Sequence, residues 1–192
     1  MKVSVVILFS SIIVAGVEAS PQTVRTFDVA GKGRLDLVVP AEWRDTTRQA
    51  TVAGARTITF SPAAGSDFTI IITVMPGVVG QRPTTTATES SGRAELHANV
   101  ERSAKQIAAR TVELSPVIQE LRGVDFSGYY FSVTDAAPGP DDFPHLTQGA
   151  TASSTVTLSF TILTRHPQAA ALDVALDALR KARWIPDAPE AH

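Results

Sequence analysis

Alternating apolar and polar residues predict that much of this chain forms β-strands. In residues 34–39, for example, Leu35, Leu37 and Val39 fall on one face of an extended chain, and the charged residues fall on the other. The strands predicted in this way cover residues 24–29, 34–39, 56–61, 67–75, 117–124, 126–134, 146–153 and 155–164, and the polar residues 46–54 are predicted to be a connection.

Two segments instead repeat their apolar residues every three or four positions, which is the spacing of one helical face. The first runs from about residue 86 to Glu113 and stops before Pro116; the second has Pro167 in its first turn. The residues predicted to face a sheet are Leu96, Val100 and Ile107 in the first helix and Leu172, Leu176 and Leu179 in the second.

The order of these elements predicts the fold class. Four strands precede the first helix, three or four strands follow it, and the second helix comes last, so strands and helices do not alternate as in a parallel sheet. We therefore expect an α+β fold, in which an antiparallel β-sheet of six to eight strands packs with two main α-helices. Ile71 lies on the opposite face from Ile70 and Ile72, so we expect this strand to be central and covered on both sides.

The first residues have the features of a secretory signal peptide. Lys2 precedes an apolar run over residues 3–17, and Val17 and Ala19 are the small residues that a signal peptidase reads. The run is shorter than the ~20 residues that a membrane-spanning helix needs. We predict cleavage after Ala19 and export to the periplasm of a bacterium or to the extracellular space; an uncleaved N-terminal anchor is the alternative.

The rest of the chain, residues 20–192, is predicted to be a single globular domain with a loose tail from about residue 187. No second apolar run is long enough to span a membrane, so we expect no transmembrane anchor after cleavage. A domain of this size buries enough surface to fold without disulfide bonds.

Composition excludes several classes of function. The chain has 192 residues, a net charge of −2 and no cysteine. The charge offers no basic surface for nucleic acid, and the lack of cysteine excludes disulfides, thiolate metal sites and a cysteine nucleophile. The phosphate-binding loop, the HExxH zinc motif and the GxSxG nucleophile motif are all missing, so the sequence predicts no cofactor, no metal and no catalytic residue.

One loop carries the candidate binding residues. Asp135, Asp141, Asp142 and His145 lie in and beside a segment rich in proline and glycine, where the chain is least constrained by strand pairing. Carboxylates and an imidazole there could contact a partner or a cation. The alternative is a solvated turn whose aspartates and prolines set only its shape.

Three short segments resemble known families. Residues 34–43, a strand followed by Pro40 and Trp43, resemble the opening element of the PsbP-like fold superfamily, which includes a nuclear Ran-binding family. Residues 146–150 and 158–164 resemble small exported bacterial proteins of unknown function. The resemblance implies an α-β-α or two-layer sheet sandwich. A secretory signal fits neither the photosystem nor the Ran-binding role, so no functional residue is carried over.

Two functions remain open at this level. The first is an exported, non-catalytic binding or accessory module, whose partner is a protein or a small molecule. The alternative is a small exported hydrolase that uses the acidic loop 135–145. If the loop were catalytic, its carboxylates and His145 should converge on a concave pocket.

Overall fold

The computed structural model describes residues 20–29, 31–50, 54–77, 86–167 and 169–187, so the predicted signal peptide and most of the predicted tail lie outside the described residues. The prediction of an α+β fold is confirmed. Ten strands form two antiparallel sheets that pack with two helices. The elements are β1 (Gln22–Val29), β2 (Gly33–Pro40), β3 (Arg44–Gln49), β4 (Arg56–Ser61), β5 (Phe68–Pro76), α1 (Thr86–Ile107), a short 3-10 helix (Ala108–Arg110), β6 (Gln119–Arg122), β7 (Ser127–Thr134), β8 (His145–Ala152), β9 (Val156–Thr164), α2 (Ala170–Lys181) and β10 (Arg183–Pro186).

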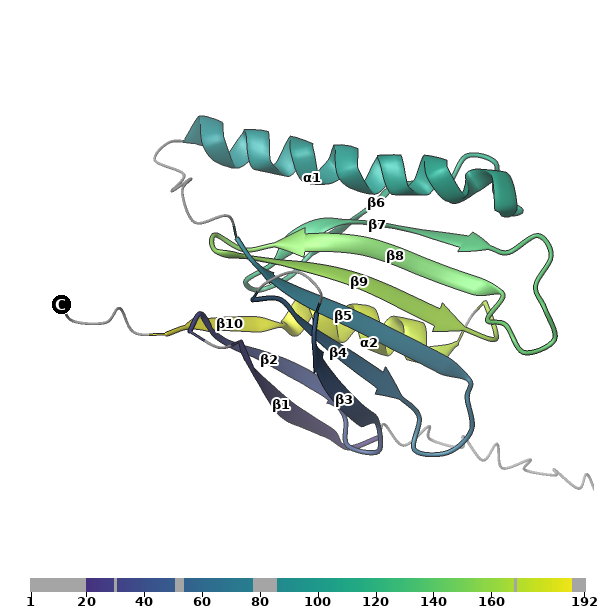
Figure 1. The fold of residues 1–192 in the computed structure, drawn as a ribbon, viewed down its shortest axis with the longest axis horizontal. Helices are drawn as coiled ribbons and strands as arrows, with labels where there is room; N and C mark the ends of the chain where they lie inside the picture. Colours follow the sequence, from purple (N-terminus) through teal and green to yellow (C-terminus); the bar gives the residue numbers. More distant parts are fainter. Residues whose placement is uncertain (1–19, 30, 51–53, 78–85, 168, 188–192) are drawn as a thin grey trace, which may run out of the picture.

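The molecule has three layers, and the large sheet is the middle one (Figure 1). Its strand order is β3-β4-β5-β9-β8-β7-β6, and every neighbouring pair is antiparallel. α1 lies against one face, which we call the outer face; the small sheet β1-β2-β10 and α2 cover the other, inner face.

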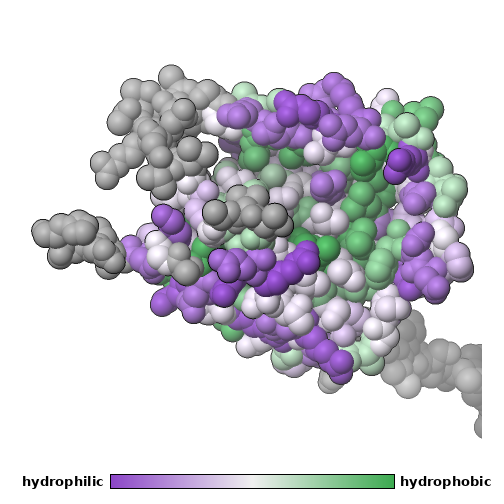
Figure 2. Space-filling view, viewed as in Figure 1, coloured by the Kyte–Doolittle hydropathy of each residue, from purple (hydrophilic) through white to green (hydrophobic). Residues whose placement is uncertain are grey.

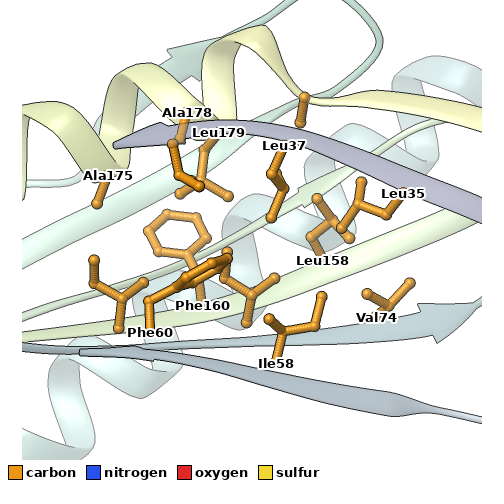
Figure 3. Packing of buried hydrophobic residues seen from close by; sticks show 14 of the residues in the cluster. Leu35, Leu37, Ile58, Phe60, Val74, Leu158, Phe160, Ala175, Ala178 and Leu179 are labelled. Carbon is orange, nitrogen blue, oxygen red and sulfur yellow. The ribbon is translucent and has the colours of Figure 1, made fainter. Parts of the chain in front are cut away.

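The main hydrophobic core fills the space on the inner face (Figure 3). Alternate side chains of β4, β5 and β9 point into it, and Phe60 and Phe160 are among the largest that are fully buried. The small sheet contributes Leu35 and Leu37 from β2. On α2 the buried positions alternate between alanine and leucine, which lets the helix approach the strands closely; these are Ala175, Leu176, Ala178 and Leu179.

α1 is held by a much smaller cluster on the outer face. Val100 and Ala104 are buried against Phe131 and Val133 of β7, and Leu146 and Ile107 are among the partly buried residues beside them. Both helices present the faces that the sequence predicts. Among the described side chains, α1 has two buried residues, Val100 and Ala104, and α2 has four.

Several boundaries differ from the predicted ones. The polar segment 46–54 is not simply a connection, because Arg44–Gln49 forms the edge strand β3. All six of its side chains are exposed, so main-chain pairing with β4 and not burial makes it extended. The first helix ends at Ile107 and not near Glu113, and α2 begins at Ala170, three residues after Pro167.

The expectation that β5 is covered on both sides is wrong. β5 is an interior strand, but Ile71 is partly exposed on the outer face. The reason is the position of α1, which lies over β7 and β8 and leaves β5 at the side of the helix. Over the described ranges no helix combines the length and the apolar character needed to cross a membrane.

Candidate functional site

The outer face of the large sheet is unusual in its chemistry. Strand register brings Ser159 of β9 beside Thr73 of β5, and Thr73 beside Thr57 of β4. The hydroxyls of Thr57 and Thr73 are 3.2 Å apart. None of the described outer positions on β4, β5, β8 and β9 is charged, and charged residues begin at β3 on one side and at β6 on the other. The uncharged positions are Thr57, Thr59, Ser61, Thr69, Ile71, Thr73, Met75, Leu146, Gln148, Ala150, Ala152, Thr157, Ser159, Thr161 and Leu163.

A groove lies where α1 overhangs this uncharged face. Its volume is about 230 Å³. Figure 2 shows the strongly polar outer surface of α1 and, below it, the paler and apolar side chains of the sheet. The described lining consists only of apolar and uncharged polar residues, which are Met75, Leu96, Asn99, Val100, Ser103, Phe131, Gln148, Gly149, Ala150, Thr157 and Ser159.

The opposite flank of α1 is fastened to the sheet by polar contacts. Arg93 donates a hydrogen bond from Nε to the Tyr129 hydroxyl on β7, at 3.1 Å, and forms an ion pair with Glu120 on β6. The ring of His97 meets the Tyr129 ring edge-on, with centroids 4.7 Å apart. α1 is therefore tied down on the β6 side, while its other side forms the wall of the groove.

The predicted loop residues do not converge on one centre. The Asp135 carboxylate accepts a hydrogen bond from the Ala137 N–H at 2.9 Å, and that of Asp142 accepts one from the Gly139 N–H at 3.0 Å. Asp141 offers its main-chain carbonyl to Arg165 at 3.3 Å. Within the described ranges no three acidic, histidine or cysteine side chains form a group that could hold a metal ion. The contacts of Asp135 and Asp142 are those of residues that shape a turn.

His145 has a different environment, at the start of β8. Its Nδ1 is 3.4 Å from the Thr134 hydroxyl, and that hydroxyl lies 3.0 Å from the Glu113 carboxylate. The second Glu113 oxygen accepts the main-chain N–H of Thr134 at 2.7 Å. Burial opposes ionisation of Glu113, but these hydrogen bonds and the nearby imidazole outweigh it and hold the pKa of Glu113 below its usual value.

This arrangement predicts a pH-dependent contribution to stability. A carboxylate with a lowered pKa in the folded state stabilises the fold above the unfolded pKa of about 4.3, and the contribution disappears as the pH falls through the folded value. We expect Glu113→Gln to lower the free energy of unfolding by about 1 kcal/mol at pH 7. Hydrogen bonds to a charged group stabilise a fold more than neutral ones do, but water weakens those of Glu113 because this side chain is partly exposed. The difference should shrink below pH 4 in thermal melts; a difference that grows on acidification would contradict this assignment.

Sequence analysis did not identify the groove. Its lining comes from α1, β5, β7, β8 and β9, which approach each other only in the folded chain. One signal was present in the sequence. The strand at residues 156–164 has no charged residue on either face, although the solvent-facing side of an antiparallel sheet is usually polar.

No family model matches the chain, and no curated protein matches it.

Proposed function

We propose that the protein is an exported, non-catalytic binding module, and that the groove beneath α1 holds an uncharged, largely apolar ligand. The observation that carries this proposal is the lining of the groove, whose described side chains are apolar or neutral and polar. A charged ligand would lose its hydration there without gaining an ionic partner.

The lining has the composition of a ligand site. Met75 and Leu96, both partly exposed, offer apolar surface, and burial of apolar surface gives about 25 cal/mol per Å². Asn99 and Gln148 offer amides that can orient a neutral polar group of the ligand. The volume of about 230 Å³ is below the roughly 300–1,000 Å³ of sites that enclose a drug-sized molecule. The groove therefore suits a small molecule or one segment of a longer chain.

The hydrolase alternative has weaker support. It rests on the row of Glu113, Thr134 and His145, in which a hydroxyl lies between a carboxylate and an imidazole. However, both hydrogen-bond donors of Thr134, its main-chain N–H and its hydroxyl, are directed to Glu113, which ties the segment after α1 to the end of β7. Asp135 and Asp142 are similarly held by main-chain N–H groups. These contacts suit structural roles better than catalytic ones.

The cellular location and the PsbP-like relationship are also proposals. The apolar segment before Ala19 supports export, and a cysteine-free domain suits the bacterial periplasm. The layered arrangement of helix, sheet and second layer is of the kind that the PsbP-like resemblance implies.

Titration with the neutral fluorescent probe N-phenyl-1-naphthylamine tests the binding proposal. N-terminal sequencing of protein recovered from the periplasm of producing cells should give Ser20 as the first residue. Addition of this protein to the probe should raise the fluorescence of the probe. Ser103→Phe places a ring in the groove and should weaken probe binding at least about tenfold, the effect of 1.4 kcal/mol.

Ala98→Phe is the matched control, because it adds the same ring to an exposed position of the same helix. It should bind the probe as the unmodified protein does. Equal binding by both variants would remove the groove as the site. A chain with intact residues 1–19 in the membrane fraction would contradict export with cleavage.

A further inference from the structure

The exposed apolar side chains of this protein gather around one sheet edge. β6 is the last strand of the large sheet, so among the described residues one of its sides has no neighbouring strand. Three exposed apolar residues precede it, and Val124 follows it. Among the exposed large apolar side chains of the described ranges only Val24, on β1, lies elsewhere; those beside β6 are Val112 (64% exposed), Leu114 (81%), Val117 (74%) and Val124 (59%).

The opposite edge of the same sheet has a different character. β3 has the sequence Arg-Asp-Thr-Thr-Arg-Gln, and all six residues are exposed. Charged side chains on an edge discourage pairing with other chains. Contiguous exposed apolar residues instead mark a surface that associates with a partner. Of the two edges of the large sheet in the described ranges, the β6 edge is the one with exposed apolar side chains beside it, and the strand itself carries one charge of each sign, Glu120 and Arg122.

The main chain of β6 presents a defined set of free groups at this edge. Gly123 donates its N–H to the Phe126 carbonyl at 2.8 Å, in the same register that pairs Leu121 with Gly128. In an antiparallel ladder the hydrogen-bonded pairs alternate. The main-chain groups of Leu121 therefore point to β7, and those of Glu120 and Arg122 point to the free edge.

Charge then selects the partner and its register. Suppose that the β6 strands of two copies pair antiparallel about a two-fold axis at Leu121. Glu120 of each copy then lies opposite Arg122 of the other. These are the two residues whose main-chain groups are free to bond across the edge. A two-fold axis at Glu120 or at Arg122 would instead place like charges opposite each other, which is unfavourable.

The same register brings two of the four exposed apolar residues, Val117 and Val124, to the interface. It places Val124 of one copy opposite Ile118 of the other, beside Val117. A hollow of about 340 Å³ lies between α1 and the segment before β6; Leu114, Pro116 and Ile118 line one side of it, and His97, Glu101 and Lys105 of α1 line the other. Burial of the apolar side chains at this interface stabilises the dimer beyond what main-chain pairing of the four residues of β6 provides.

We propose that the protein forms a two-fold dimer through its β6 edges, which joins the two large sheets into one continuous sheet. Isologous contacts of this kind are the commonest in homo-oligomers. The groove beneath α1 opens over β5, β8 and β9, away from this edge. Dimerisation and ligand binding therefore use separate surfaces, and Arg122→Glu separates them most cleanly because it leaves the Arg93–Glu120 ion pair of α1 in place.

A pair of charge variants tests the register. Glu120→Arg makes both facing positions positive, and Arg122→Glu makes both negative. The full-length gene product should sediment as a dimer, and each variant alone should dissociate at least about tenfold more readily. An equimolar mixture of the two variants should form a heterodimer, because unlike charges then face each other again. Thermal melts of each variant check that it is folded.

A second pair of variants tests the apolar surface independently of those charges. Val117→Asp should weaken the dimer. Val24→Asp makes the same substitution at an exposed valine on β1 and should not weaken it. Three results would overturn the proposal: a monomeric mass for the unmodified chain at every concentration, charge variants that dimerise as the unmodified chain does, or a mixture that stays monomeric while both variants are folded.

Discussion

Replacing Phe131 with alanine should lower the free energy of unfolding by about 3–5 kcal/mol, which is the usual cost of removing a buried phenyl group. Phe131 is fully buried on the outer face of β7 and contacts the small cluster that contains Val100 and Ala104 of α1. In a domain of this size that change should lower the thermal midpoint by roughly 6–20 °C.

The loss of stability should be concentrated in α1, because Val100 and Ala104, the buried residues among its described side chains, belong to the same small cluster as Phe131. Hydrogen exchange of α1 amides should accelerate more than that of α2, whose buried residues belong to the main core. Phe131→Leu keeps much of the side-chain volume and should cost less than half as much. If α1 and α2 lost protection equally, the idea of a separately anchored α1 would be wrong.

Adding a methyl group at Gly149 should destabilise the protein by about 3 kcal/mol, at the upper end of the range for overpacking. A Cβ atom at this position in β8 would lie 2.4 Å from the Tyr129 carbonyl oxygen and 2.6 Å from Cζ of Phe160. The carbonyl belongs to β7 and cannot move without disturbing the ladder between the two strands. Denaturant melts of Gly149→Ala measure this cost.

Gly92→Ala is the matched control, because the same methyl group meets nothing within 4 Å there. Gly92 lies in α1, where alanine is favoured over glycine by about 1 kcal/mol. The two substitutions should therefore change stability in opposite directions. A stable Gly149→Ala variant would mean that β7 and β8 are packed less tightly than the structure indicates.

The sequence predicted the faces of the elements well. Alternation in residues 34–39 and 156–164 identified the buried side chains of β2 and β9, and the three- and four-residue spacing identified Val100 and Leu179. These predictions succeeded because the direction of a side chain depends on local backbone geometry, which repeats every two residues in a strand and every 3.6 in a helix.

The missed elements lack that local pattern. β3 consists of polar residues with both faces exposed, and it is extended because β4 supplies its hydrogen bonds. β10 follows α2 directly, and its residue Trp184 lies opposite Leu35, almost 150 positions earlier in the chain. β3 has no apolar alternation, and β10 has only four residues and ends in proline, so main-chain pairing with β4 and with β2 decided their conformation.

The candidate sites divide in the same way. The sequence drew attention to the loop with Asp135, Asp141 and Asp142, but whether such residues converge depends on how the loop closes, and hydrogen bonds to Ala137 and Gly139 decided that here. Glu113 had no distinguishing neighbour in sequence, yet it contacts Thr134.

By itself, the sequence determined the α+β class, the helical faces, the buried side of most strands and an uncharged character on alternate positions of β9. Only the tertiary structure decided the strand order, the groove beneath α1 and the free edge at β6. Side-chain periodicity is local and survives in any fold that keeps the element. The choice of neighbouring strand is made by contacts between distant residues, which no local pattern encodes.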